Sequence, residues 1–200
     1  MSRIKFAAEI LSPLNPTSIL DVGCRDASLA DEFPTAEYAG ADLNSDTRGR
    51  VKYVGDIARI SLDRKFDAVV ALDVLEHLDN PSEVFDRLAD AAQRIMLVSL
   101  PNTYDLKSRV QFVFTSGLGD KYRFLERTPT DRHRWLMNRA EISAFYAAKA
   151  ARHGLTLQVI DLRYGRSGNL TLSSVAGRLL SCVLPPSFSA QTILGLFLRT

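Results

Sequence analysis

Short apolar runs rich in β-branched residues recur along this chain, and segments with helical periodicity lie between several of them. Such runs predict buried strands, here over residues 18–22, 38–43, 51–54, 66–72, 94–100 and 155–160. A last run, 191–199, is apolar almost throughout and suits a strand that is covered on both faces. Strands that alternate with helices indicate the α/β class, here a doubly wound, mostly parallel sheet with helices on both faces.

Capping residues place the helices between these strands. Asn80, Pro81 and Glu83 supply an N-cap, a proline for the first turn and an early acid, so a helix is predicted from Pro81 to Ala92. A second helix is predicted over 138–152, because Gly154 follows as a C-terminal stop. The first sixteen residues and residues 171–184 are also expected to be largely helical.

Composition limits the class of protein. With 200 residues, 46% hydrophobic and 24% charged, we expect one soluble domain over residues 1–200. The uncharged stretch 179–198 is long enough to raise the question of a membrane span, but Pro185 and Pro186 interrupt it. The apolar stretch of the first sixteen residues is short and interrupted, so we do not expect it to act as a secretory signal. Two distant cysteines, Cys24 and Cys182, favour reduced thiols and a cytoplasmic location.

The net charge of the chain gives little information about its binding partners. The net charge of +2 is too small to indicate nucleic acid, which needs a clustered basic surface, so a nucleic-acid partner is not expected. The oligomeric state is left open.

Polar residues follow three of the predicted strands: 21–26 after the first, Asp42 at the end of the second, and 73–77 after the fourth. The carboxyl ends of parallel strands form the ligand crevice of an open α/β sheet. Asp42 lies 21 positions after Asp21, a typical distance for an acid that binds ribose hydroxyls. Gly23 permits a sharp turn, and a helix from about Ala27 would offer free N–H groups.

Asp56 ends the third strand, where it or its neighbour's backbone can reach an adenine amino group. Each of these acids, taken alone, has a plainer alternative as a turn acid or a helix cap. Their joint spacing favours a nucleoside site.

The motifs ILDVGCRDASL, YAGADL, VGDI, FDAVVALDVLEHLDNP and RIMLVSLPN resemble those of the class I S-adenosylmethionine-dependent methyltransferases, especially the group that includes the ubiquinone-biosynthesis O-methyltransferases. The resemblance covers residues 17–101 closely and 138–161 more loosely. It implies a Rossmann-like, seven-stranded sheet whose last strand inserts antiparallel beside the fifth. It also implies S-adenosylmethionine as cofactor.

The resemblance and the spacing together predict a set of cofactor-binding residues: Asp21, Gly23, Arg25, Asp42, Leu43, Asp56, Ile57 and Leu72. One departure stands out, because Arg25 and Ala27 replace the second and third glycines of the family's first motif. Arg25 could bind the methionine carboxylate of the cofactor. Alternatively, it points outward and pairs with Asp26 or another acid, or cofactor binding is lost.

Catalysis needs few residues, because S-adenosylmethionine brings its own activated methyl group. We predict His77, His133 and Asp73 as the catalytic residues, with a histidine as general base. The prediction is a site without metal, in which Glu76 and His77 cap or brace the turn after the fourth strand. In the alternative, the spacing resembles metal-dependent relatives, and a divalent ion is held by Asp73, Glu76, His77 and His133.

Residues 102–137 are expected to form an insertion, as a lid or substrate loop. Its arginines, lysines and aromatic residues suit single-stranded nucleic acid, an anionic glycan or lipid head group, or peripheral contact with a membrane surface. The alternative is a cover whose aromatics pack on the sheet. The predicted function is methyl transfer to an oxygen of a small-molecule or glycan-linked acceptor. The alternatives are a non-catalytic binding protein and an NAD-dependent oxidoreductase.

Overall fold

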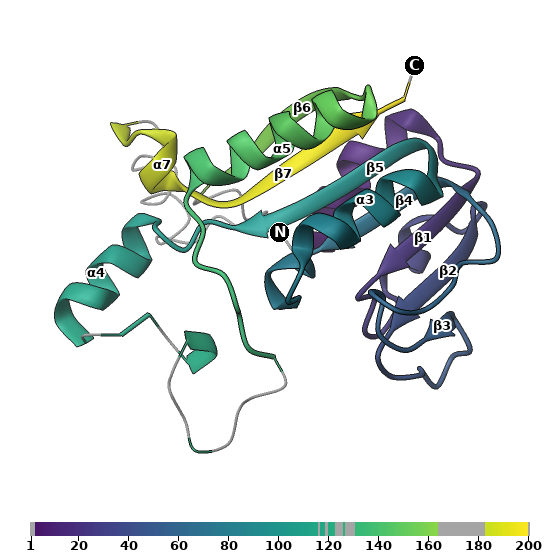
Figure 1. Cartoon of the computed structure of the whole chain (residues 1–200), viewed down its shortest axis with the longest axis horizontal. Coiled ribbons are helices and arrows are strands. Elements are labelled where there is room, and N and C mark those ends of the chain that lie inside the picture. Colours follow the sequence, from purple (N-terminus) through teal and green to yellow (C-terminus); the bar gives the residue numbers. More distant parts are fainter. Residues whose placement is uncertain are drawn as a thin grey trace.

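The structure is a computed structural model that describes residues 3–115, 117–118, 120–122, 126, 131–163 and 183–199. Its strands form one seven-stranded sheet in the order β3-β2-β1-β4-β5-β7-β6 (Figure 1). The strands are β1 (Ser18–Val22), β2 (Glu37–Asp42), β3 (Val51–Val54), β4 (Phe66–Leu72), β5 (Ala92–Pro101), β6 (Thr156–Arg163) and β7 (Ala190–Leu198). The pairs among β1 to β5 are parallel, and β7 runs antiparallel to both of its neighbours. The predicted Rossmann-like fold is confirmed.

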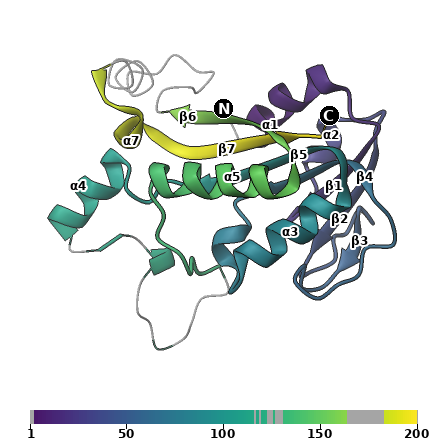
Figure 2. The same ribbon diagram turned by 45° about the horizontal axis from the view of Figure 1, so that its top comes forward.

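Helices cover both faces of the sheet. They are α1 (Arg3–Leu11), α2 (Leu29–Glu32), α3 (Pro81–Ala91), α4 (Leu106–Thr115), α5 (Arg139–His153) and α7 (Pro186–Ser189), with short 3₁₀ turns η1 (Ser12–Leu14), η2 (Leu75–His77) and η3 (Asp120–Tyr122). Side chains of α3 and α5 share one core with the sheet, and those of α1 and α2 share the other. Figure 2 shows α3 and α5 together on one side of the strands, with α1 beyond them.

The two cores explain why the strands read as nearly continuous apolar runs. Successive side chains of a strand point to opposite faces, so Ile95 and Leu97 of β5 enter the α1 core, whereas Met96 and Val98 enter the α3–α5 core. A strand covered on both faces buries every position, and alternation with polar residues disappears.

A group of aromatic rings closes the α3–α5 core. The ring centroids of Tyr146 in α5 and Phe197 in β7 lie 5.4 Å apart, edge to face, and the Tyr146 hydroxyl donates to the carbonyls of Val98 and Ile193. Gly195 lies beneath both rings, where an added Cβ would come within 2.9 Å of each. The glycine is therefore needed for close packing.

A buried charge joins α3 to α5 on this face. Lys149 of α5 is buried, and its Nζ donates to the Ser82 carbonyl at 2.7 Å and to Asp86 at 2.6 Å. His153 and Arg152 lie against the same carboxylate. Asp86 therefore has a pKa below its usual value; its partial burial, the largest influence, acts upward but is outweighed by hydrogen bonds from His153 and Lys149.

The predicted helix ends are confirmed to within a residue at Asn80 and at the capping box of Asn138 and Glu141. The helix expected from about Ala27 begins two residues later, and α2 has only the four residues Leu29–Glu32. Most of the helix expected over 171–184, and Cys182 with it, lies outside the described residues. A single domain with an insertion at 102–137 stays a prediction.

Candidate active site

The first loop keeps the shape of a glycine-rich turn although two of its glycines are absent. Gly23, Arg25 and Ala27 have φ angles of 68°, 51° and 54°, all in the left-handed region. A non-glycine residue in that region costs about 1 kcal/mol, so the surrounding contacts must hold Arg25 and Ala27 there. An added Cβ on Gly23 would meet Val74 at 2.5 Å. The absence of a side chain at Gly23 therefore lets the turn at residues 73–77 pack directly against the first loop.

Asp42 joins the first loop to the end of β2. Its Oδ2 accepts a hydrogen bond from the Arg25 backbone N–H at 2.9 Å, and its Oδ1 accepts one from Asn44 at 3.2 Å. Asp42 remains half-exposed, and the neighbouring Leu43 is 68% exposed. An accessible carboxylate beside an uncovered leucine fits the ribose and base of a nucleoside, so these residues suit the predicted cofactor.

Asp21 lies in the sheet beneath that loop. Its carboxylate is buried and accepts a hydrogen bond from the Tyr38 hydroxyl at 2.7 Å. Burial raises the pKa of Asp21 to about 7; the Tyr38 hydrogen bond opposes this rise, and the nearby charges of Asp42 and Asp26 add to it. The first acid of the motif is thus a buried, high-pKa carboxyl held by a tyrosine.

Asp56 forms a local turn. Its Oδ1 accepts a hydrogen bond from the Ala58 N–H at 2.9 Å, and the Arg59 Nε lies 3.7 Å from its Oδ2. This is the geometry of a turn acid, and contact of Asp56 or Ile57 with adenine stays a prediction.

The Arg25 side chain extends toward residues of the insertion. The side chain is 71% exposed, and its Nη2 lies 3.8 Å from Asp131. Asp131 also lies 3.2 Å from the Lys121 Nζ and 3.4 Å from the His77 Nε2. One acid of the insertion therefore lies between the Arg25 and Lys121 cations and the imidazole of His77. A contact between Arg25 and the cofactor carboxylate stays a prediction.

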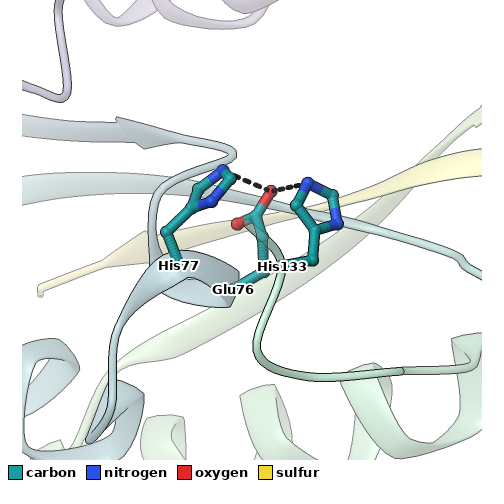
Figure 3. Close-up of side chains that lie close together, drawn as sticks. All are labelled: Glu76, His77 and His133. Atoms are coloured by element: carbon teal, nitrogen blue, oxygen red, sulfur yellow. Dashed lines mark ion pairs between the residues drawn. The ribbon is translucent and has the colours of Figure 1, made fainter. Parts of the chain in front are cut away.

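Glu76, His77 and His133 lie together at the end of β4 (Figure 3). The Glu76 Oε1 lies 3.9 Å from the His77 Nε2 and 4.0 Å from the His133 Nε2. The Glu76 side chain is fully buried, yet neither oxygen makes a hydrogen bond with any described residue. The carboxylate therefore does not cap the turn; the Glu76 backbone carbonyl does hold the insertion, by accepting from the Arg134 N–H at 2.8 Å.

Hydrogen bonds fix the orientation of both imidazoles. The His77 Nδ1 lies 3.0 Å from the Arg132 carbonyl and must donate to it, which leaves the Nε2 of a neutral ring as an acceptor. The His133 Nδ1 lies 2.7 Å from the Tyr122 hydroxyl, and its Nε2 has no partner among the described residues. The Glu76 carboxyl and the His133 Nε2 thus face one space without a hydrogen bond to any described residue, beside the accepting Nε2 of His77.

The pKa values of the cluster fit this arrangement. Burial raises the pKa of Glu76 to about 7 and lowers that of His133 to about 4. Burial also holds the pKa of His77 below its usual range, against its hydrogen bond to the Arg132 carbonyl. Both rings are therefore neutral at pH 7, the state in which imidazole binds a metal ion or accepts a proton. The donor set of two imidazoles and one carboxylate suits a divalent cation.

Asp73 is not part of this cluster. Its Oδ1 accepts a hydrogen bond from the Ser99 hydroxyl at 2.5 Å, and its other oxygen forms an ion pair with Arg3 of α1. The structure brings together three of the four residues proposed for a metal, and Asp73 lies apart with partners of its own. Arg3, Ser99, Tyr122 and Asp131 are neighbours of the site that no sequence pattern indicated.

Comparison with known proteins agrees with this geometry. A family model described as a methyltransferase domain matches residues 2–155. The methyltransferase domain of bacterial CtHen1-CN is 18% identical, with a TM-score of 0.63 over 98% of this chain and 97% of that one. The magnesium protoporphyrin IX methyltransferase ChlM of Synechocystis PCC 6803, solved with bound SAH, is 15% identical, with a TM-score of 0.61 over 98% of this chain and 82% of that one.

A third solved structure, the small RNA methyltransferase HEN1, is 18% identical, with a TM-score of 0.66 over 98% of this chain and 25% of that one. A search of curated proteins gives no match.

A sheet of this order, with an acid at the end of β2 beside the first loop, defines the class I methyltransferase fold. The chain belongs to the methyltransferase domain family and is an S-adenosylmethionine-dependent methyltransferase. The oxidoreductase and the non-catalytic binding protein are thereby excluded. Within the described part of the chain, no helix is both long and apolar enough to cross a bilayer.

Proposed function

We propose that this enzyme methylates an oxygen atom of a small-molecule or glycan-linked acceptor. The observation that carries the proposal is the buried cluster of Glu76, His77 and His133, since a hydroxyl acceptor must lose a proton and these groups can take it or stabilise its loss. The similarity of the first motifs to the ubiquinone-biosynthesis O-methyltransferases also supports oxygen.

The cofactor lies, in this proposal, along the carboxyl ends of β1, β2 and β4. Asp42 accepts hydrogen bonds from the ribose, and Arg25 binds the methionine carboxylate. The remaining contacts come from the first loop, the end of β2, the turn after β3 and the end of β4: Asp21, Gly23, Leu43, Asp56, Ile57 and Leu72. S-adenosylmethionine supplies the activated methyl group, and the protein aligns the acceptor oxygen with it. Asp73 borders that alignment at the end of β4.

The proton leaves by one of two routes. In a site without metal, the neutral His77 or His133 accepts the hydroxyl proton through its Nε2. We favour the second route, in which Glu76, His77 and His133 hold a divalent cation. The buried Glu76 oxygens and the His133 Nε2 have no hydrogen-bond partner among the described residues, which is costly unless a cation satisfies them. When bound, such an ion lowers the pKa of a coordinated hydroxyl. Asp73 has no place in this ligand set.

The experiment measures cation binding and methyl transfer separately. Calorimetry with MnCl₂ on the chelator-treated protein should show one site, which Glu76→Gln abolishes and Glu9→Gln, an exposed glutamate of α1, leaves intact. Methyl transfer from labelled S-adenosylmethionine to hydroxylated acceptors should then depend on the cation. If the protein binds no cation and a chelator leaves methyl transfer unchanged, the histidines alone would accept the hydroxyl proton. Acceptance only of amines or thiols would refute the oxygen acceptor.

A cytoplasmic location also remains a proposal, supported by the burial of the free thiol of Cys24.

A further inference from the structure

Helix α4 leaves the end of β5 and projects from the body of the protein (Figures 1 and 2). None of its ten residues is buried. The Arg109 guanidinium lies 4.4 Å from the ring centroid of Phe188 in α7. This contact holds the first turns of α4 against α7. A helix of ten residues is marginally stable by itself in water. A surface that covers α4 would therefore stabilise it.

The apolar side chains of α4 face outward. Leu106, Val110, Val113 and Phe114 occupy positions i, i+4, i+7 and i+8, which form one stripe along a helix. The last three are 46%, 73% and 82% exposed. In a helix that packs on a core, such a stripe is the buried face.

Three residues of α4 are half-buried, Leu106, Ser108 and Gln111, and the other seven are exposed. Phe112 lies on the opposite side of the helix from the stripe and is 55% exposed. The outer part of α4 is therefore open to solvent on both sides. The expectation that the aromatics of the insertion pack on the sheet is therefore wrong for α4. An uncovered apolar surface of this kind marks an interaction site.

The charges around the stripe select the partner. Lys107 and Arg109 flank it on opposite sides, and residues 106–118 contain no acid. A second copy of α4 would bring cations against cations without an acidic partner on the helix. An anionic lipid surface, in contrast, offers head groups to both cations and an apolar layer to the stripe.

We propose that α4 docks this protein onto an anionic membrane surface, with Val110, Val113 and Phe114 inserted at the level of the head groups. Because only four residues separate the end of β5 from the start of α4, docking would bring the carboxyl edge of the sheet close to the bilayer. The proposal depends neither on the acceptor atom nor on the cation site.

Co-sedimentation with vesicles tests it. The protein should sediment with vesicles of phosphatidylcholine and phosphatidylserine, and much less with phosphatidylcholine alone. Phe114→Ser and Val113→Ser should each weaken binding by about tenfold. The matched control is Val54→Ser, which truncates an exposed valine at the end of β3 and should leave binding unchanged. Circular dichroism and SAH binding verify that each variant is folded.

Three results would overturn the proposal. The first is that the unmodified protein fails to bind anionic vesicles. The second is that the variants with Phe114 and Val113 replaced bind these vesicles as tightly as the unmodified protein, which would mean that another surface is responsible. The third is a dimer in analytical ultracentrifugation that these substitutions dissociate, because the stripe would then be covered by a second copy.

Discussion

Replacing Asp21 by Asn should stabilise the protein increasingly as the pH rises. The buried Asp21 carboxyl has a pKa of about 7, against 3.8 for an ordinary aspartate. A carboxyl whose pKa is raised by folding loses its proton first in the unfolded state, so its ionisation favours unfolding from about pH 4 up to about pH 7. Asparagine keeps an oxygen that can accept the Tyr38 hydrogen bond and does not ionise.

The size of the effect follows from the two pKa values. Each pKa unit corresponds to about 1.4 kcal/mol, so ionisation of Asp21 costs about 4 kcal/mol above pH 7. Between pH 5 and pH 8, where the unfolded carboxyl is already ionised, the stability of D21N relative to the natural sequence should rise by about 2.5 kcal/mol.

Urea denaturation followed by circular dichroism at pH 5, 6, 7 and 8 measures this difference. Asp31→Asn is the control, because hydrogen bonds from Arg50 hold the pKa of the exposed Asp31 below its usual value. That carboxylate stays ionised in both states from pH 5 to 8, so the stability difference of D31N should not change over this range. If the stability difference between D21N and the natural sequence were also constant from pH 5 to pH 8, the claim that Asp21 is desolvated would be refuted.

Three further substitutions test the packing and the first loop. Gly195→Ala should cost about 2 kcal/mol in urea denaturation, because its Cβ would overlap the aromatic rings above it; an unchanged midpoint would mean that the rings move aside. Lys149→Met should cost about 2 kcal/mol, since it removes a buried partner of Asp86, and stability equal to the natural sequence would show that Arg152 and His153 suffice. Arg25→Ala should weaken S-adenosylmethionine binding about tenfold in calorimetry, whereas equal affinity would mean that the guanidinium serves only Asp131.

Much of the fold was predictable because both faces of the sheet are covered. Apolar runs then mark strands directly, and β1, β3 and β4 begin and end where the runs do. Capping residues likewise fix the starts of α3 and α5. The end of α2 at Phe33 was predictable, because Pro34 follows and disfavours helical backbone in the residue before it. Its late start was not predictable, because it follows from the left-handed backbone of Arg25 and Ala27.

The site was predictable only in part. Strand-end acids such as Asp42 stand out by spacing, whereas the left-handed backbone at Arg25 and Ala27 does not, because these residue types seldom adopt it. The contacts of Tyr122 and Asp131 with the histidines depend on how the insertion folds back over the end of β4. The stripe of α4 is regular in sequence, but only the structure shows that it faces solvent.

A crystal structure of the complex with S-adenosylhomocysteine tests the central claim most directly. The account predicts that both ribose hydroxyls lie within hydrogen-bond distance of the Asp42 carboxylate and that the sulfur faces the ends of β4 and β5. A ribose bound away from Asp42, or a product that leaves this edge of the sheet empty, would contradict it.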